Sequence, residues 1–174
     1  MTTVTASYAG AGGKHAAPQA QDMSTATPPA GDVYLVVGYD GSPPADRALE
    51  AAAGLLEGRT GRIDVVYVAH IPSIDMMSAG AVGGIEFSFG EIAQELRAEA
   101  GERLGGREDG WEFERREGVI ADQLIAAATT IRDTHPGDSV TIVVGASSHA
   151  LHHVAGSVAI SLARHSPVPL LVVP

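Results

Sequence analysis

Four short runs of apolar, mostly β-branched residues recur along the chain and constrain its fold more than any other feature. They lie at residues 33–37, 63–69, 140–144 and 169–173. A strand that is apolar along its whole length is typical of a parallel sheet, where helices cover both faces. Residues 111–115 alternate apolar and polar side chains instead. That pattern predicts a fifth strand, at an edge of the sheet.

Segments with helical periodicity separate these strands. Pro43-Pro44, with Ser42 as a natural N-cap, opens a helix that we expect to end near Gly58. Further helices are expected over residues 91–104, after Gly118, and from about residue 156 to residue 165. Strict alternation of strands and helices predicts an α/β fold: a single doubly wound, Rossmann-like, five-stranded parallel sheet with helices on both faces.

The chain of 174 residues suits one domain preceded by a tail. Residues 1–32 are rich in Ala, Gly, Thr, Ser and Pro and show no apolar period, so we interpret them as a disordered tail. The domain is expected to span residues 33–174. Within it, residues 73–89 are rich in Gly, Ser, Met and Ala, which predicts a long loop, either a lid or a surface insertion.

Composition excludes several classes of function. The chain has no cysteine, so disulfides, thiolate metal sites and cysteine nucleophiles are excluded. Its formal net charge is −10 and it shows no basic stripe, which argues against nucleic-acid and anionic-membrane partners. No apolar run is long enough for a transmembrane helix, so we expect a soluble cytoplasmic protein.

In doubly wound folds, ligands lie beyond the carboxyl ends of the strands, where the strand order reverses. Two segments are expected there, residues 38–42 after the first strand and residues 145–157 after the fourth. Both segments contain glycines, which allow tight turns of the backbone. No Walker P-loop, Gly-x-Ser-x-Gly elbow or Gly-x-Gly-x-x-Gly is present, so catalysis is not expected.

At this point the sequence resembles the universal stress protein family. The resemblance covers about residues 33–174 and keeps the order of the elements. It rests on residues 36–42 with 47–49, on 116–118, on 143–145 with 156–158, and on 164–173.

The resemblance implies the strand order 3-2-1-4-5, homodimers formed through the C-terminal strand, and, in one branch, binding of ATP, with or without Mg²⁺. That branch uses Gly-x-x-Gly, nine residues, then Gly-Ser or Gly-Thr. The resemblance also implies that an aspartate after the first strand holds ribose or base groups, and that backbone beside the second strand contacts the adenine. The implied nucleotide-binding residues are Asp40, Val68, Gly145, Ser148, His149, Gly156, Ser157 and Val158.

The chain departs from this motif in its middle. Ser148 stands where the second glycine is expected, and seven residues rather than nine separate it from Gly156. His152 and His153 lie in the shortened stretch, and with no carboxylate or cysteine nearby they do not predict a metal site. The sequence therefore leaves two main functions open: an adenine-nucleotide-binding regulatory protein, or a family member that binds no nucleotide and acts as a protein-interaction module. An enzyme of the wider adenine-nucleotide hydrolase-like group is a third alternative.

Overall fold

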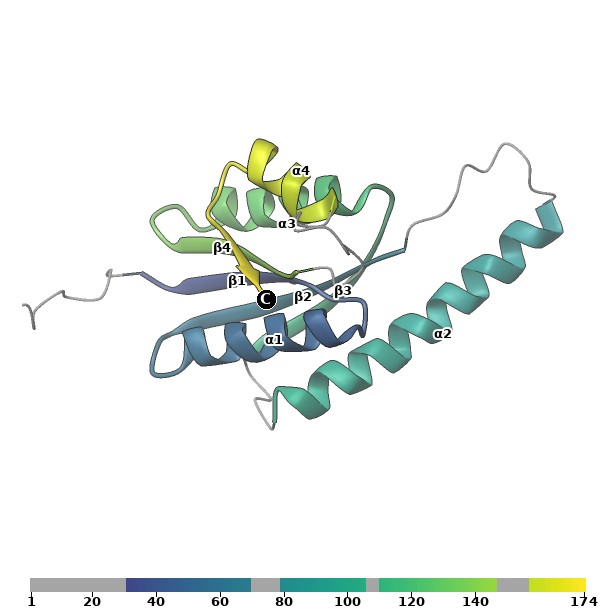
Figure 1. Ribbon diagram of the computed structural model, residues 1–174, viewed down its shortest axis with the longest axis horizontal. Coiled ribbons are helices and arrows are strands. Elements are labelled where there is room, and N and C mark those ends of the chain that lie inside the picture. The colour runs from purple at the N-terminus through teal and green to yellow at the C-terminus, as the bar shows by residue number, and fades with distance from the viewer. Residues whose placement is uncertain (1–30, 70–78, 106–109, 147–156) are drawn as a thin grey trace, which may run out of the picture.

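The computed structural model describes residues 31–69, 79–105, 110–146 and 157–174 (Figure 1). Residues 1–30 of the expected tail and the residues Ser148, His149, His152, His153 and Gly156 lie outside this part of the chain. Strands and helices alternate as follows: β1 (Val33–Gly38), α1 (Pro43–Leu56), β2 (Gly61–Ala69), α2 (Ala79–Arg103), β3 (Trp111–Glu117), α3 (Ile120–Thr134), β4 (Ser139–Gly145), α4 (Ser157–His165) and β5 (Leu170–Val173).

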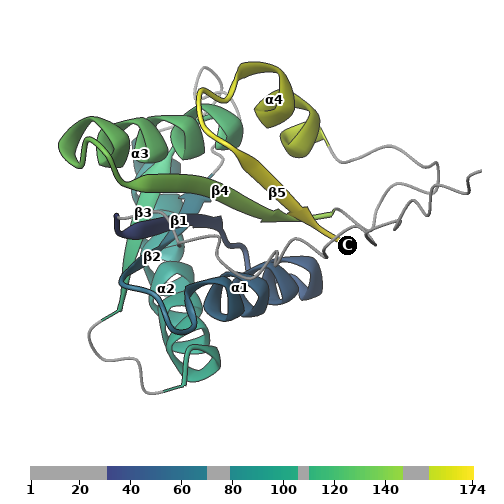
Figure 2. The ribbon, with the colours of Figure 1, turned by 90° about the vertical axis from the view of Figure 1, so that its left-hand side faces the viewer.

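The five strands form one parallel sheet in the order β3-β2-β1-β4-β5. This confirms the predicted fold class and strand order, and it places β3 at an edge as its alternating pattern indicated. Helices α1 and α2 cover one face of the sheet, and α3 and α4 cover the other (Figure 2). The polypeptide therefore has three layers, with the sheet in the middle.

The central strand β1 is buried on both faces, which explains its continuous apolar sequence. Leu35 and Val37 pack into the core beneath α1 and α2, whereas Tyr34 and Val36 pack into the core beneath α3 and α4. Successive side chains of a strand point to opposite faces, so a strand covered on both sides needs apolar residues at every position.

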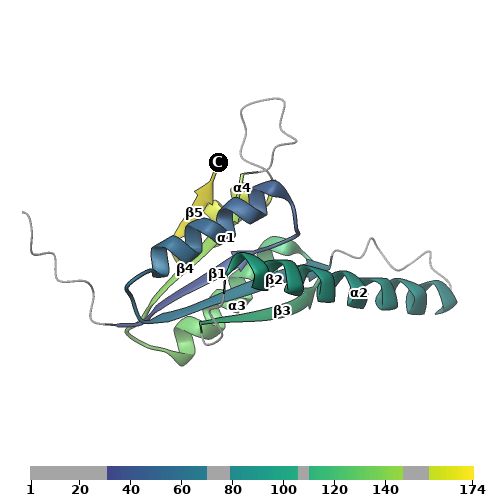
Figure 3. The same cartoon turned by 90° about the horizontal axis from the view of Figure 1, so that it is seen from below.

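Helix α2 begins at Ala79, so the prediction of a loop over residues 73–89 is wrong from residue 79 onward. The glycines at positions 80, 83 and 84 lower helix propensity and suggested a loop. A helix that has nucleated gains one hydrogen bond for each residue added, which lets the segment before residue 91 continue the helix. The ribbon of α2 consequently continues past the carboxyl edge of the sheet (Figure 3).

Other boundaries differ from the expected ones by about two residues, the usual uncertainty at the ends of elements. Of the helices among the described residues, none has the combination of length and apolar sequence needed to cross a membrane.

Candidate functional site

The chain reverses its direction of winding between β1 and β4. From β1 it crosses to β2 on one side, and β4 pairs with the other side of β1. Val37 of β1 is paired with Val143 of β4, so the residues that follow them, including Asp40 and Gly145, lie at the same edge of the sheet. This is the topological switch point at which doubly wound folds bind ligands.

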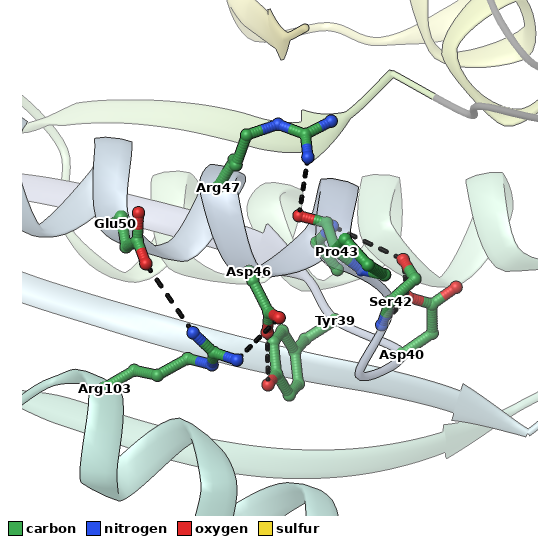
Figure 4. Close-up of polar contacts among 9 residues, drawn as sticks. Tyr39, Asp40, Ser42, Pro43, Asp46, Arg47, Glu50 and Arg103 are labelled. Atoms are coloured by element: carbon green, nitrogen blue, oxygen red, sulfur yellow. Dashed lines mark hydrogen bonds and ion pairs between the residues drawn. The ribbon is translucent and has the colours of Figure 1, made fainter.

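The turn after β1 fixes the orientation of Asp40. The backbone N–H of Ser42 donates to Oδ1 of Asp40 at 3.1 Å, and the Ser42 hydroxyl donates to the same oxygen at 2.6 Å (Figure 4). Ser42 Oγ in turn accepts from the N–H of Ala45 at 3.4 Å and so caps α1, as the sequence predicted. Asp40 is exposed, and its Oδ2 has no hydrogen-bond partner among the described residues. One carboxylate oxygen of Asp40 therefore shapes the turn.

Gly41 gives this turn its shape. Its φ is +74°, a left-handed conformation that favours glycine, and a Cβ on it would lie 2.7 Å from Cδ2 of Leu96 in α2. The turn that carries Asp40 thus lies directly against α2.

Tyr39, the residue before Asp40, is buried and carries a polar network beneath the turn. Its hydroxyl donates to Oδ1 of Asp46 at 2.9 Å, and Oδ2 of Asp46 accepts from Arg103 at 2.7 Å. Arg103 also lies 3.6 Å from Glu50. Burial, followed by the hydrogen bond to Asp46, raises the pKa of Tyr39 to about 12. The network joins the turn after β1 to α1 and to the C-terminal end of α2, and no motif in the sequence predicted it.

Gly145 ends β4 in contact with the first turn of α1. A Cβ at this position would lie 2.2 Å from the carbonyl oxygen of Pro44, far inside van der Waals contact. Packing of α1 on the sheet is therefore sufficient to require glycine here, whether or not a phosphate also approaches.

Val68 and Val158 are half-buried, and both pack against the core beneath α3 and α4. Val68 is the penultimate residue of β2, where it pairs with Arg116 of β3. Ser157 is the first residue of α4. The two valine side chains thus pack against the core. Only backbone groups at these positions remain to contact a ligand.

The charges of Asp40 and Arg115 both act at this edge. Burial raises the pKa of Tyr67 in β2; the positive charge of Arg115 opposes this rise, and the negative charge of Asp40 adds to it. No group of three or more His, Asp or Glu side chains suited to a metal ion occurs among the described residues.

The structure thus brings Asp40, Val68 and Gly145 to the carboxyl ends of three neighbouring strands, β1, β2 and β4. A doubly wound α/β domain with polar and glycine-bearing turns at its switch point defines a class of proteins that includes many nucleotide binders. The family model described as "Universal stress protein family" matches residues 35–174. This chain belongs to the universal stress protein family.

Solved structures share the fold. The universal stress protein UspA from Lactobacillus plantarum is 19% identical, with a TM-score of 0.57, and the match covers 83% of this chain and 99% of that one. A universal stress protein in complex with cAMP is 22% identical, with a TM-score of 0.56 and coverage of 81% and 96%. The universal stress protein from Archaeoglobus fulgidus in complex with dAMP is 16% identical, with a TM-score of 0.51 and coverage of 83% and 98%. Among curated proteins, the search found no match to this sequence.

Proposed function

We propose that this protein binds an adenine nucleotide, ATP with Mg²⁺, at the carboxyl edge between β1 and β4. The observation that carries the proposal is the placement of Asp40 and Gly145 on either side of the switch point of a universal stress protein fold. The proposed contacts are Asp40, Val68, Gly145, Ser148, His149, Gly156, Ser157 and Val158.

Each described contact has a chemical role. Oδ2 of Asp40 would accept from a ribose hydroxyl or a base amino group, and the β2 backbone beside Val68 would face the adenine. The first turn of α4, which begins at Ser157, leaves backbone N–H groups without helical partners and so favours a phosphate. Two of the family structures of the same fold are complexes with cAMP and dAMP, which supports an adenine nucleotide as the ligand class.

We further propose that the protein acts in the cytoplasm through conformation and dimerisation rather than turnover. The sequence lacks the motifs that phosphoryl- and acyl-transfer enzymes use, and β5 is an edge strand of the sheet. Phosphate release from ATP, measured over hours for the wild type and a Gly156→Val variant, tests this: release that the variant abolishes would identify an enzyme.

Two observations favour a second function, a protein-interaction module that binds no nucleotide. Asp40 already orders the turn before α1 through Ser42. The absence of a side chain at Gly145 is already required by Pro44. Both residues therefore have roles in the fold that would preserve them without any ligand.

The Asp40→Asn variant separates the two functions. Asparagine keeps a side-chain oxygen that accepts from Ser42, so the turn survives, but it removes the negative charge. Glu57→Gln is the matched control, because Glu57 is exposed at the other end of α1 and loses the same charge. The nucleotide-binding function predicts that Asp40→Asn weakens ATP binding about tenfold, since hydrogen bonds to charged groups contribute roughly 1.5–3 kcal/mol. Equal affinities for both variants would remove Asp40 from the site.

A further inference from the structure

The polar network beneath the Asp40 turn connects the proposed nucleotide site to helix α2. Tyr39, covalently next to Asp40, is 2% exposed, and its hydroxyl reaches Asp46, whose side chain is 16% exposed. Arg103, in the last turn of α2, closes the network by donating to Asp46 at 2.7 Å. Figure 4 shows these side chains converging from the turn after β1, from α1 and from α2.

A second contact lies on the other side of the same turn. Leu96 of α2 packs in the same core as Tyr39 and meets Gly41, where a Cβ would be only 2.7 Å from Leu96. Asp40 therefore lies between Gly41, which packs against Leu96 of α2, and Tyr39, which is connected to Arg103 of α2 through Asp46.

Helix α2 is anchored over its C-terminal half. Ala93, Leu96 and Ala100 pack against the core, as does Leu104 directly after the helix, while the ribbon before them continues past the carboxyl edge of the sheet (Figure 3). Two of the side chains that attach α2 to the domain, Leu96 and Arg103, are thus also the ones connected to the Asp40 turn.

We propose that Arg103 is a positioning residue for the nucleotide site, because it fixes the Asp40 turn through Asp46 and Tyr39. Nucleotide binding and the packing of α2 on α1 then stabilise each other. The proposal rests on the proposed nucleotide-binding function. It adds a regulatory connection, in which a partner that shifts α2 changes nucleotide affinity and a bound nucleotide tightens α2.

The coupling has a simple thermodynamic basis. A turn already held in its binding conformation loses less entropy when the ligand arrives, so releasing it weakens binding. Equilibrium linkage then requires that the ligand raise the equilibrium constant for packing of α2 on α1 by the same factor. This reciprocity distinguishes a positioning role from a purely structural one.

Arg103→Ala, Arg103→Lys and Arg97→Ala form the test set. Arg97 is the matched control because it is exposed on the same helix and forms no ion pair with the described residues, so its removal makes the same change in net charge. Asp46→Asn breaks the ion pair from the other side and serves as a second variant if Arg103→Ala folds poorly. ATP affinity is measured by calorimetry for each full-length variant. Amide hydrogen exchange over residues 93–103 is measured with and without ATP.

The proposal predicts that Arg103→Ala and Asp46→Asn bind ATP at least about fivefold more weakly than the wild type, the low end of coupling between sites. Arg103→Lys should regain most of that loss, and Arg97→Ala should match the wild type. ATP should slow exchange in α2 of the wild type and of Arg97→Ala but not of Arg103→Ala.

If the wild type binds ATP, and Arg103→Ala binds it as tightly as Arg97→Ala does, this inference is overturned. The nucleotide-binding function would then remain intact. Equal rates of amide hydrogen exchange in wild-type α2 with and without ATP would overturn the inference as well. A wild-type protein that binds no ATP would overturn the proposed function itself, and the inference with it.

Discussion

The carbonyl oxygen of Pro44 occupies the space that a side chain on residue 145 would need, since a Cβ there would lie only 2.2 Å away. The contact joins the first turn of α1 to the end of β4 at the switch point. Neither backbone can retreat easily, because α1 is packed on the sheet and β4 is paired with both β1 and β5.

Gly145→Ala is therefore expected to destabilise the protein by roughly 1–3 kcal/mol or more, the cost of inserting a methyl group into a filled space. Urea denaturation in the absence of nucleotide measures it. Gly54→Ala is the control: a Cβ added to Gly54 in α1 would meet open space, so alanine should stabilise the helix by about 0.5–1 kcal/mol. A Gly145→Ala variant as stable as the wild type would show that α1 and β4 are not packed as described.

The buried hydroxyl of Tyr39 is expected to make the folded protein less stable as the pH rises into the alkaline range. The pKa of Tyr39 is raised from 10.0 to about 12 in the folded protein, so the folded state retains this proton where the unfolded state loses it. Stability is present in full below the unfolded pKa and is lost as pH rises toward the folded value. Between about pH 8 and about pH 11 the loss amounts to about 1.4 kcal/mol.

Tyr39→Phe removes this titration. Urea denaturation of the wild type and the variant at the two pH values checks it, with other groups cancelling in the difference. The variant is expected to be less stable near pH 8, by about 1 kcal/mol for the lost hydrogen bond, and to lose less stability than the wild type on going to pH 11. Parallel losses in both proteins would contradict the pKa shift.

The fold could be predicted from the sequence because its determinants are local. Strands such as β1 and β4 are buried on both faces, and burial on both faces leaves an uninterrupted apolar run that is visible in the sequence. The cap at Ser42 depends on a side chain three residues from the N–H that it accepts from, so it could be predicted as well.

The polar network could not be predicted, because its partners are brought together only by the tertiary structure. Asp46 and Arg103 are 57 positions apart and lie on different helices, whose rotation relative to each other is set by the core. The one available signal was Tyr39, an aromatic residue with a hydroxyl directly beside the apolar strand, since such a hydroxyl needs a hydrogen-bond partner when it is buried. Likewise, the sequence pointed to Gly145 as a phosphate contact but could not reveal Pro44 against it.

A substitution at the unpaired edge of β5 can test the predicted homodimer. The carbonyls of Pro169 and Val173 accept from Ile142 and Ala146, so these alternate residues direct their backbone groups toward β4. Val172 is at an intervening position of the strand, so its backbone N–H and C=O point toward the unpaired edge. Val172→Pro removes that outward N–H without removing a bond to β4.

Light scattering at micromolar concentration should show a dimer for the wild type and a monomer for Val172→Pro. Val172→Ala is the control, because it also removes side-chain packing but keeps the N–H, and it should remain dimeric. A monomeric wild type would overturn the dimer, and a dimeric Val172→Pro would move the interface away from β5.

Calorimetric titration of the wild-type protein with ATP and Mg²⁺ tests the central claim most directly. Binding of an adenine nucleotide at the switch point predicts saturable heat with one nucleotide per chain, and a much weaker response for Asp40→Asn than for Glu57→Gln. The absence of binding by a folded wild-type protein would contradict it and leave the protein-interaction module as the function of this fold.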